Sequence, residues 1–363
     1  MKIGRVKIEG IKSYKRTKFT AENYNILAGE NNSGKSNIIS AIRWFFKHQS
    51  FKLTKEDINT GFKTDPSIII EFVFEDGDSI PSKFKNEFAD RTGKKFLVRA
   101  YCNINELKQK PQSPKYQILK FYGKPEDFTL PKLVDIIYVP SIRQLNDELK
   151  FTANSTINKL VSKFVIERIL EEDEHTKKYS NVKDAVEELS NYINEGEDSP
   201  FGELKRSLKK HMLDYGNKEL NFTLNPPEPN DLIKNSFEPY VDIEGSKFKL
   251  DSQGMGYQRS LIFSLICNMV ELESKPSTLL NMYLIEEPEL FLHPNHQNHF
   301  KNKLMQLSRI NNNQLIITSH SPYFLNNIDN YSQVKRISIS NNVSNLKEIT
   351  HEQVSDICKK MEK

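Results

Sequence analysis

The sequence predicts an α/β fold built on a mixed central sheet, and three observations lead to this expectation. Apolar strand-like runs alternate with helix-like runs around residues 24–47 and again around residues 278–319. A glycine-rich loop separates the first strand-like run from the first helix-like run. Short strand-like runs near the N-terminus add an antiparallel β subdomain, and a stretch rich in Lys and Glu adds a helical insertion.

Length and composition fit a globular protein. The chain has 363 residues, of which 28% are charged and 37% hydrophobic, which suits one large domain with insertions or two domains. No apolar run approaches the roughly 20 residues that a membrane span requires. The first five residues lack the apolar block of a signal peptide, and Cys102, Cys267 and Cys358 form no C-x-x-C pair. We therefore expect a cytoplasmic protein without membrane contact, disulfide framework or cysteine zinc site.

Strand-like runs recur through the first 140 residues. Ile3–Glu9 and Phe19–Ala28 are expected to form strands around a turn and to lead into the glycine-rich loop, with a helix over Asn37–Lys47 after it. Val134–Val139 is an apolar run, interrupted only by Asp135, that ends at Pro140, as in a central parallel strand. Turn signals separate three further strand-like runs, Ser67–Glu75, Lys95–Asn105 and Lys115–Tyr122.

The second half begins with the helical insertion, from Ser155 to about Tyr215, where apolar residues fall at helical spacing. Tyr240–Leu250 is typical of a hairpin around Glu244-Gly245, and Arg259–Val270 of an apolar helix. A strand-like run at Thr278–Ile285 then opens a β-α-β unit, described below. We expect a first lobe at 1–150, the insertion at 151–235, a second lobe at 236–345 and a tail at 346–363.

The glycine-rich loop "GENNSGKS" matches the phosphate-binding pattern G-x-x-x-x-G-K-[ST] at every fixed position. In such a loop glycines let backbone amides close around phosphate oxygens, the lysine reaches the terminal phosphates, and the last hydroxyl binds magnesium. The helix that follows points its N-terminal dipole at the phosphates. The predicted nucleotide-binding residues are Gly29, Asn31, Asn32, Ser33, Gly34, Lys35, Ser36 and Asn37, with Ser36 also a magnesium ligand.

Two adjacent carboxylates, Glu286 and Glu287, follow the strand-like run Thr278–Ile285 and precede Pro288. Carboxylates after a buried strand are costly unless a cation or a reacting water uses them. In a nucleotide site the first would hold magnesium through water, and the second would orient or deprotonate the attacking water. We therefore assign Glu286 to the metal and Glu287 to catalysis.

A strand-end histidine completes the second lobe. Gln314–Ser319 places His320 at its carboxyl end, and the helix-like span Asn295–Arg309 joins it to the preceding strand as a β-α-β unit. Parallel pairing would bring Glu287 and His320 to one sheet edge, where ligands bind, so His320 is expected to contact the terminal phosphate.

A second glycine-containing segment, "SQGMGYQ" at residues 252–258, opens the apolar helix. Small residues before a helix N-terminus form an anion site. Its predicted nucleotide contacts are Ser252, Gly254 and Gly256.

The order of these motifs resembles the ABC-type ATPases of the SMC and recombination group, and the opening "IEGIKSYKR" is similar to that group too. "LIEEPELFLHP" at Leu284–Pro294 and "TSHSPYFL" at Thr318–Leu325 resemble the OLD (overcoming lysogenization defect) ATPases, which include the ATPase half of the Gabija defence protein. The resemblance implies an ABC-type P-loop NTPase fold that hydrolyses ATP with Mg2+. It also implies Gln144 as the glutamine-loop contact, and Lys35, Glu287 and His320 as catalytic residues.

The resemblance further implies a homodimer, or a higher oligomer, in which Ser252 and Gly254 of one chain cap the nucleotide of the other. The helical insertion is expected to add a dimer contact. OLD proteins usually continue into a Toprim nuclease, whereas no D-x-D follows Leu325 here. We therefore expect an ATPase without a nuclease site that regulates a DNA-directed effector, such as a nuclease, located downstream in a longer protein or on a separate chain. The expected setting is antiphage defence or DNA processing.

Two alternatives fit parts of the sequence. A nucleotide-dependent DNA-binding repair mediator that acts as a clamp would use the basic first segment, which has only Glu9 as an acid. A metal protein would use His293, His296 and His299, although their spacing drifts around a helix. The basic residues of the first segment are Lys2, Arg5, Lys7, Lys12, Lys15, Arg16 and Lys18.

ATP is preferred to GTP as the nucleotide because of the resemblance and because there is no N-K-x-D tetrapeptide.

Overall fold

The computed structural model describes residues 1–75, 95–119, 126–127, 133–141, 173–194, 199, 202, 240–243, 245–249, 252–254, 256–258, 260–261, 264, 280–290, 292, 294–325 and 333–349. The chain divides into two compact units. The first contains Met1–Asn146 and Gln253–Lys363, and the second contains Asp147–Ser252.

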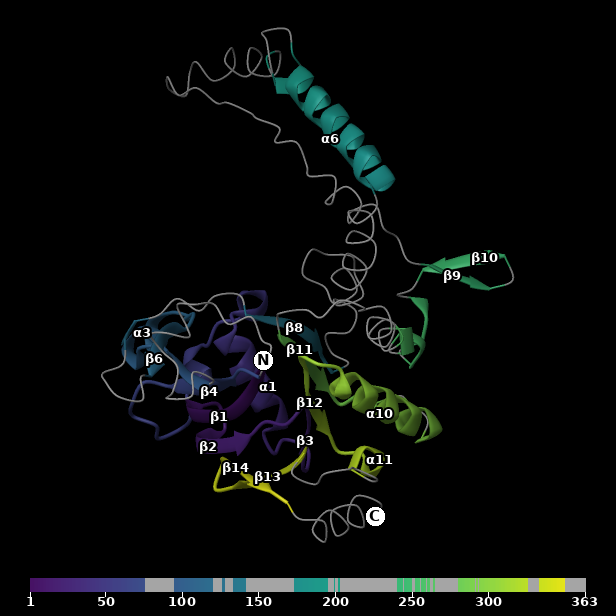
Figure 1. Cartoon of the computed structure of the whole chain (residues 1–363). Coiled ribbons are helices and arrows are strands. Elements are labelled where there is room, and N and C mark those ends of the chain that lie inside the picture. The colour runs from purple at the N-terminus through teal and green to yellow at the C-terminus, as the bar shows by residue number, and fades with distance from the viewer. Residues whose placement is uncertain are drawn as a thin grey trace, which may run out of the picture. The chain divides into compact units, whose positions relative to one another are not determined.

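An antiparallel sheet forms the N-terminal part of the first unit (Figure 1). Side chains alternate between buried and accessible along its strands, as expected where one face covers the core. Its order is β2-β1-β4-β5-β6-β7. The strands are β1 (Lys2–Ile11), β2 (Tyr14–Thr20), β4 (Ser67–Val73), β5 (Lys95–Tyr101), β6 (Lys115–Leu119) and β7 (Glu126–Asp127).

The second sheet of this unit is mixed, as the sequence predicts, and has the order β14-β13-β3-β12-β11-β8. The four strands β3, β12, β11 and β8 run parallel, and β13 pairs parallel with β3 and antiparallel with β14. Every residue of β3, β11 and β12 is buried, because both faces of these strands are covered. The strands are β3 (Tyr24–Ala28), β8 (Val134–Val139), β11 (Leu280–Glu286), β12 (Asn313–Ser319), β13 (Val334–Ser340) and β14 (Val343–Glu348).

Helix α1 (Lys35–Phe45) follows β3, and its apolar side chains, among them Ile38, Ile42 and Trp44, are fully buried. They belong to one hydrophobic cluster that also contains residues of both sheets, so the helix links the two sheets through the core. The structure also describes in this unit the helices α3 (Ile104–Gln109), α10 (Pro294–Arg309) and α11 (Pro322–Leu325), and 3-10 turns at His48–Ser50 and Lys55–Asp57. Helix α10 joins the parallel strands β11 and β12, which confirms the predicted β-α-β unit.

Three predicted strands end earlier in the structure, and the first of them, Ser67–Glu75, stops at Val73. Phe19–Ala28 is not one strand, because β2 ends at Thr20 and β3 begins at Tyr24 in the other sheet. The Asn25 side chain closes the turn between them by accepting a hydrogen bond from Glu22 N and donating one to Glu22 O. Lys95–Asn105 likewise stops at Tyr101, because the Asn103 side chain caps the N-terminus of α3.

In the second unit the structure describes helix α6 (Asp173–Asn194) and the hairpin of β9 (Tyr240–Ile243) and β10 (Ser246–Lys249). Helix α6 lies inside the predicted insertion, and the hairpin turns at Gly245, as predicted, where φ is 83°. Most of Arg259–Val270, and Cys267 and Cys358, lie outside the described residues, whereas Cys102 is buried. None of the described helices is both long and apolar enough to cross a membrane.

Candidate nucleotide site

The phosphate loop connects β3 to α1, and its glycines are required by geometry. Gly34 has φ of 106° and precedes the first helical residue, Lys35. A Cβ atom on Gly29 would lie 2.2 Å from the Ile337 carbonyl oxygen, and one on Gly34 would lie 2.3 Å from Ser344 Oγ. The first turn of α1 contains no acidic residue, so nothing there opposes an anion at the positive end of the helix dipole.

Side chains from two distant segments hold this loop in place. Ser344 on β14 donates a hydrogen bond of 2.5 Å to the Ser33 carbonyl, and its Oγ also lies 2.7 Å from Ser13 Oγ. Asn37 Nδ2 donates to Ser13 Oγ at 2.7 Å, and the Tyr14 hydroxyl donates to the Gly34 carbonyl at 3.1 Å. The sequence did not identify Ser13, Tyr14 or Ser344, because a serine beside a turn carries no distinguishing pattern.

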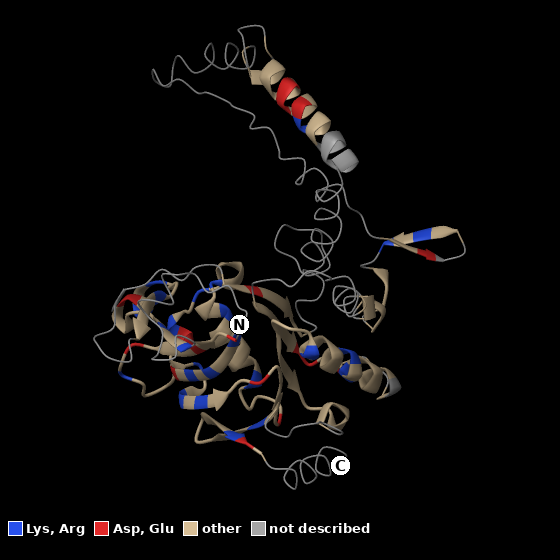
Figure 2. Cartoon of the chain, in the orientation of Figure 1, with Lys and Arg blue, Asp and Glu red and all other residues tan. Residues whose placement is uncertain are grey.

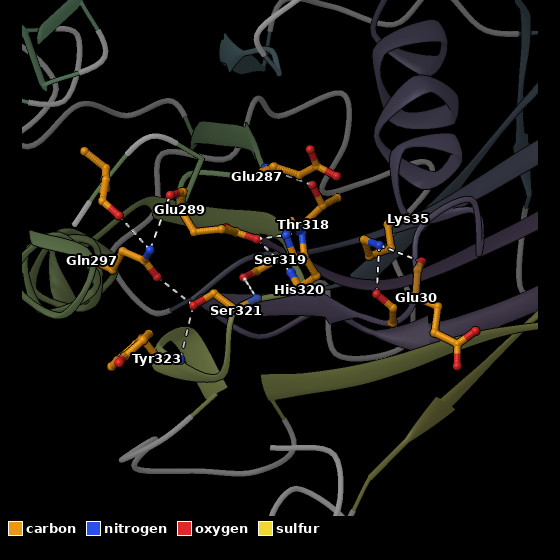
Figure 3. Close-up of polar contacts among 12 residues, drawn as sticks. Glu30, Lys35, Glu287, Glu289, Gln297, Thr318, Ser319, His320, Ser321 and Tyr323 are labelled. Carbon is orange, nitrogen blue, oxygen red and sulfur yellow. Dashed lines mark hydrogen bonds and ion pairs between the residues drawn. The ribbon is translucent and has the colours of Figure 1, made fainter. Parts of the chain in front are cut away.

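Lys35 points into the loop that precedes it. Its Nζ donates hydrogen bonds to the carbonyl oxygens of Gly29 and Glu30, at 2.9 Å and 2.8 Å (Figure 3). Burial lowers the pKa of Lys35, while the negative charges of Glu287, Glu289 and Glu30 oppose that change. The carboxylates at the end of β11 therefore stabilise the charged form of Lys35. Its ammonium can exchange its two carbonyl partners for phosphate oxygens.

The two predicted magnesium ligands meet directly. Ser36 Oγ donates to Glu286 Oε2 at 2.9 Å, and the Tyr138 hydroxyl donates to Glu286 Oε1 at 2.9 Å. The guanidinium carbon of Arg43 lies 3.8 Å from the centre of the Tyr138 ring. Burial raises the pKa of Glu286, and the hydrogen bonds from Ser36 and Tyr138 and the charge of Arg43 oppose that change. A hydroxyl and a buried carboxylate in contact form an oxygen donor set that suits Mg2+.

Glu287 follows β11 with a backbone φ of 44°, in the left-handed region that non-glycine residues rarely adopt. Its main-chain N–H donates to Thr318 O at 2.9 Å and lies 3.2 Å from Thr318 Oγ1, so the end of β12 holds it there. Such strained backbone is common at active sites. The parallel register, with Glu286 opposite Thr318, places Glu287 and His320 at the same sheet edge, which confirms that sequence prediction.

Glu289 is a residue of this edge that the sequence analysis did not single out. Its Oε1 accepts a hydrogen bond of 2.7 Å from the main-chain N–H of His320 and lies 3.1 Å from His320 Nδ1 (Figure 3). Burial raises the pKa of Glu289, whereas hydrogen bonds from the main chain of His320 and of Glu289 itself, and the charge of His320, oppose that change. A third acid two residues after Glu287 was the signal available in the sequence.

Contact of the remaining predicted residues with this edge stays a prediction. Gln144 and His293 lie outside the described residues. Ser252 belongs to the second unit, where its Oγ donates to Lys249 O at 2.6 Å. Gly254 begins the turn that leads into Gly256, its carbonyl accepting from Tyr257 N at 2.9 Å. Contact of this segment with nucleotide stays a prediction.

The histidine alternative finds no support in the described part of the chain. No group of three or more His, Cys, Asp or Glu residues suited to a metal ion occurs there.

Comparison with known proteins identifies the family. A family model described as an AAA ATPase domain matches residues 1–210 and 103–325, which together span most of the chain. The chain belongs to this AAA ATPase family. The Old nuclease of Escherichia phage P2 is 27% identical over 90% of this chain, and the endonuclease GajA of Bacillus cereus (strain VD045) is 22% identical over 91% of it. The predicted OLD membership is confirmed.

This AAA ATPase spans only part of those relatives, 57% of the length of each. Solved structures show the fold. An Smc head bound to the C-terminal winged-helix domain of ScpA matches with a TM-score of 0.54 and 14% identity, over 98% of this chain and all of that one. Stu0660 of Streptococcus thermophilus matches with a TM-score of 0.51 and 14% identity, over 95% of this chain and 76% of that one. The fold is that of the SMC-like P-loop ATPases, as predicted.

Proposed function

We propose that this AAA ATPase domain binds ATP with Mg2+, hydrolyses it, dimerises around the nucleotide and thereby regulates a DNA-directed effector such as a nuclease. The observation that carries the proposal is the contact between Ser36 and Glu286 at 2.9 Å. It joins the end of the phosphate loop to the end of β11, and it leaves Lys35 and Glu287 on either side of the place where a terminal phosphate would lie.

Each residue has a distinct part in the proposed reaction. Lys35 and the N-terminus of α1 neutralise the phosphates, and Ser36 and Glu286 would hold a magnesium ion, which would stabilise the negative charge of the terminal phosphate and the leaving group. Glu287 orients the attacking water and accepts its proton. His320 contacts the terminal phosphate from the neighbouring strand end. Binding and hydrolysis therefore draw on residues separated by more than 280 positions, from Lys35 to His320.

The proposed dimer and effector are supported by family membership. The relatives are named a nuclease and an endonuclease, and this chain spans 57% of each. An ATPase domain of this kind would control such an activity from the same longer protein or from a separate chain, in antiphage defence or DNA processing. In the proposed dimer Ser252 and Gly254 of one chain cap the nucleotide bound by the other, and the helical insertion adds a contact.

A DNA-binding repair clamp is the second candidate, and exposed basic residues on β2 favour it. Lys15, Arg16 and Lys18 are exposed there, and basic positions gather on the antiparallel sheet (Figure 2). Acidic residues lie among them, however, and reduce the net positive charge. Five of the seven basic residues noted above form ion pairs, Lys2 with Glu75, Arg5 with Glu71, Lys7 and Arg16 with Glu9, and Lys12 with Asp57.

The deciding experiment combines ATP turnover with mass measurement. Purified wild-type protein should release phosphate from ATP only with Mg2+, and Glu287→Gln should bind ATP without turnover and shift to a dimer in light scattering. Lys35→Ala is the matched control and should show neither effect. A Glu287→Gln protein whose mass does not respond to ATP would contradict nucleotide-driven dimerisation.

A second experiment tests the DNA clamp. Duplex DNA is titrated at two salt concentrations, with Lys15→Glu/Arg16→Glu as the control, since phosphate contacts weaken steeply with salt.

A further inference from the structure

The buried carboxylate of Glu289 lies against His320, the residue proposed to contact the terminal phosphate. The Glu289 side chain is only 4% exposed, whereas the His320 side chain beside it is 38% exposed. One carboxylate oxygen, Oε1, accepts a hydrogen bond from the main-chain N–H of His320 at 2.7 Å and lies 3.1 Å from its Nδ1, within ion-pair distance but without the alignment of a hydrogen bond. Burying a carboxylate is unfavourable unless it is paired, so its place against the histidine calls for a reason.

Further hydrogen bonds connect this pair to Gln297 on α10 (Figure 3). Ser321, next to His320, donates through Oγ to Gln297 Oε1 at 2.7 Å. Gln297 Nε2 in turn lies 3.4 Å from the carbonyl oxygen of Glu289 and 2.9 Å from that of Leu292. The carboxylate, the histidine, the serine and the glutamine thus hold the turn after β11 against the turn after β12.

The same turn also contains Glu287, the proposed general base. Leu290 N donates to Glu287 O at 3.2 Å, and Leu292 N to Glu289 O at 3.1 Å. Glu287 is itself bonded to Thr318, so the two strand ends are joined at two points, Glu287 to Thr318 and Glu289 to His320. This arrangement fixes the position of His320 relative to Glu287, the residue proposed to activate the attacking water.

We propose that Glu289 is the positioning residue for His320: its carboxylate faces Nδ1 and keeps a proton there, so that the ring, when it also carries a proton on Nε2, donates that second N–H to the terminal phosphate. A carboxylate only accepts hydrogen bonds, so the ring nitrogen that faces it carries the hydrogen. A histidine without such a partner is free to place its proton on either nitrogen and to rotate. The inference rests on the proposed phosphate contact of His320, but its first test does not.

Histidine nitrogen NMR tests the proton position without any turnover. The protein is labelled with 15N-histidine, and the His320 signals are identified by their loss in His320→Gln. We expect the wild-type ring to be protonated on Nδ1, and Glu289→Gln, which presents no charge to that nitrogen, to shift it toward the Nε2 form. Glu106→Gln removes an exposed carboxylate elsewhere and should change nothing. A wild-type His320 protonated on Nε2 alone would overturn the proposal even if the protein hydrolyses ATP normally.

Kinetics then test whether the position matters. Glu289→Gln should lower kcat by about ten- to a hundredfold, the usual scale for losing a residue that orients a functional one, and should leave KM for ATP nearly unchanged. In a His320→Ala background the same substitution should cost almost nothing, since there is no ring to orient. Equal losses in the two backgrounds would show a structural role and overturn the proposal. Glu289→Ala provides the same comparison if the Gln variant folds poorly.

Discussion

Ser36 Oγ donates a hydrogen bond to Glu286 Oε2 although 250 residues separate the two in the chain. The contact arises because β3, which leads into the phosphate loop, and β11, which ends at Glu286, flank β12 in the parallel part of the mixed sheet. Parallel strands deliver their carboxyl ends to one edge, so the sheet assembles the hydroxyl and the carboxylate. Tyr138 at the neighbouring strand β8 holds the other carboxylate oxygen, which orients Glu286 before any ligand arrives.

The two adjacent glutamates should separate in their kinetics. Glu287→Gln should retain ATP binding and slow hydrolysis by at least roughly a hundredfold, the scale for losing a positioned general base. Glu286→Gln should instead raise the magnesium concentration required for half-maximal turnover. Phosphate release measured over a magnesium titration distinguishes them. If both variants gave the same magnesium dependence and the same residual rate, the division of roles would be wrong.

Lys35→Ala should abolish measurable ATP binding, because no other group replaces an ammonium that pairs with the terminal phosphates. Folding should survive, since burial already lowers the pKa of Lys35 and its bonds in the free loop are to two carbonyl oxygens. Calorimetric titration with ATP checks the first point and thermal unfolding the second. Lys35→Arg keeps the charge and tests the shape of the site. ATP affinity unchanged in Lys35→Ala would exclude the phosphate-loop assignment.

Much of this architecture could be predicted from local sequence. Val134–Val139 and the run ending at Ser319 are mostly apolar stretches, and the structure places strands over Val134–Val139 and Asn313–Ser319. The parallel arrangement that brings Glu287 and His320 together followed from the β-α-β spacing alone. The sequence predicts Phe19–Ala28 as one strand, whereas the observed split depends on Asn25, whose turn-closing bonds leave no trace in periodicity.

The supporting residues of the site could not be predicted, because their partners are distant in sequence. Ser344 bonds to Ser33 across 311 positions, and Tyr138 to Glu286 across 148. Glu289 looked like one more acid in an acidic motif, and only its burial against His320 distinguishes it. Strand pairing decides such contacts, so they become visible only once the sheet order is known.

The anchoring serine of β14 should matter to nucleotide affinity. Ser344→Ala removes the 2.5 Å hydrogen bond to Ser33 O and the contact with Ser13 Oγ, which leaves a buried carbonyl unsatisfied. We expect a loss of about 1–2 kcal/mol in unfolding free energy, and weaker ATP binding because the loop is no longer held in shape. Ser338→Ala, at an exposed position of the adjacent strand β13, is the control and should change neither quantity. Equal ATP affinity in the two variants would show that the loop needs no anchor.

Lys335 should make stability depend on alkaline pH. It is fully buried on β13, its Nζ lies 3.1 Å from Asn25 Oδ1, and burial lowers its pKa to about 8, against the opposing charges of Glu348 and Glu22. Between pH 8 and the ordinary value of 10.5 the folded state binds fewer protons than the unfolded state, so stability rises with pH across that window. At about 1.4 kcal/mol per pKa unit, the rise is at most about 3 kcal/mol.

Lys335→Met should remove that rise. Denaturant unfolding between pH 7 and pH 10 should show the difference between wild type and variant changing with pH, while Asn25 Oδ1 keeps its bond from Glu22 N at 2.8 Å. Lys18→Met, at an exposed position of β2, should leave the wild-type profile unchanged. A wild-type and a Lys335→Met profile that run parallel over this range would show that the buried ammonium titrates at its ordinary pKa.

The shared-site dimer can be tested separately from oligomeric state by mixing two inactive variants. Lys35→Ala disables the phosphate loop, and Ser252→Arg places a bulky cation in the segment proposed to cap the nucleotide of the other chain. In a mixed dimer one composite site carries both lesions and the other carries neither, so ATPase activity should return when the two proteins are combined. Random pairing makes half of the dimers mixed, and each has one intact site, so about a quarter of the wild-type rate is expected if the sites act independently.

The control is Lys35→Ala mixed with Lys35→Ala/Ser252→Arg, in which every site has a damaged loop and no activity should appear. Heterodimers shown to form by light scattering or affinity capture, yet without activity, would contradict independent sites that are shared between chains.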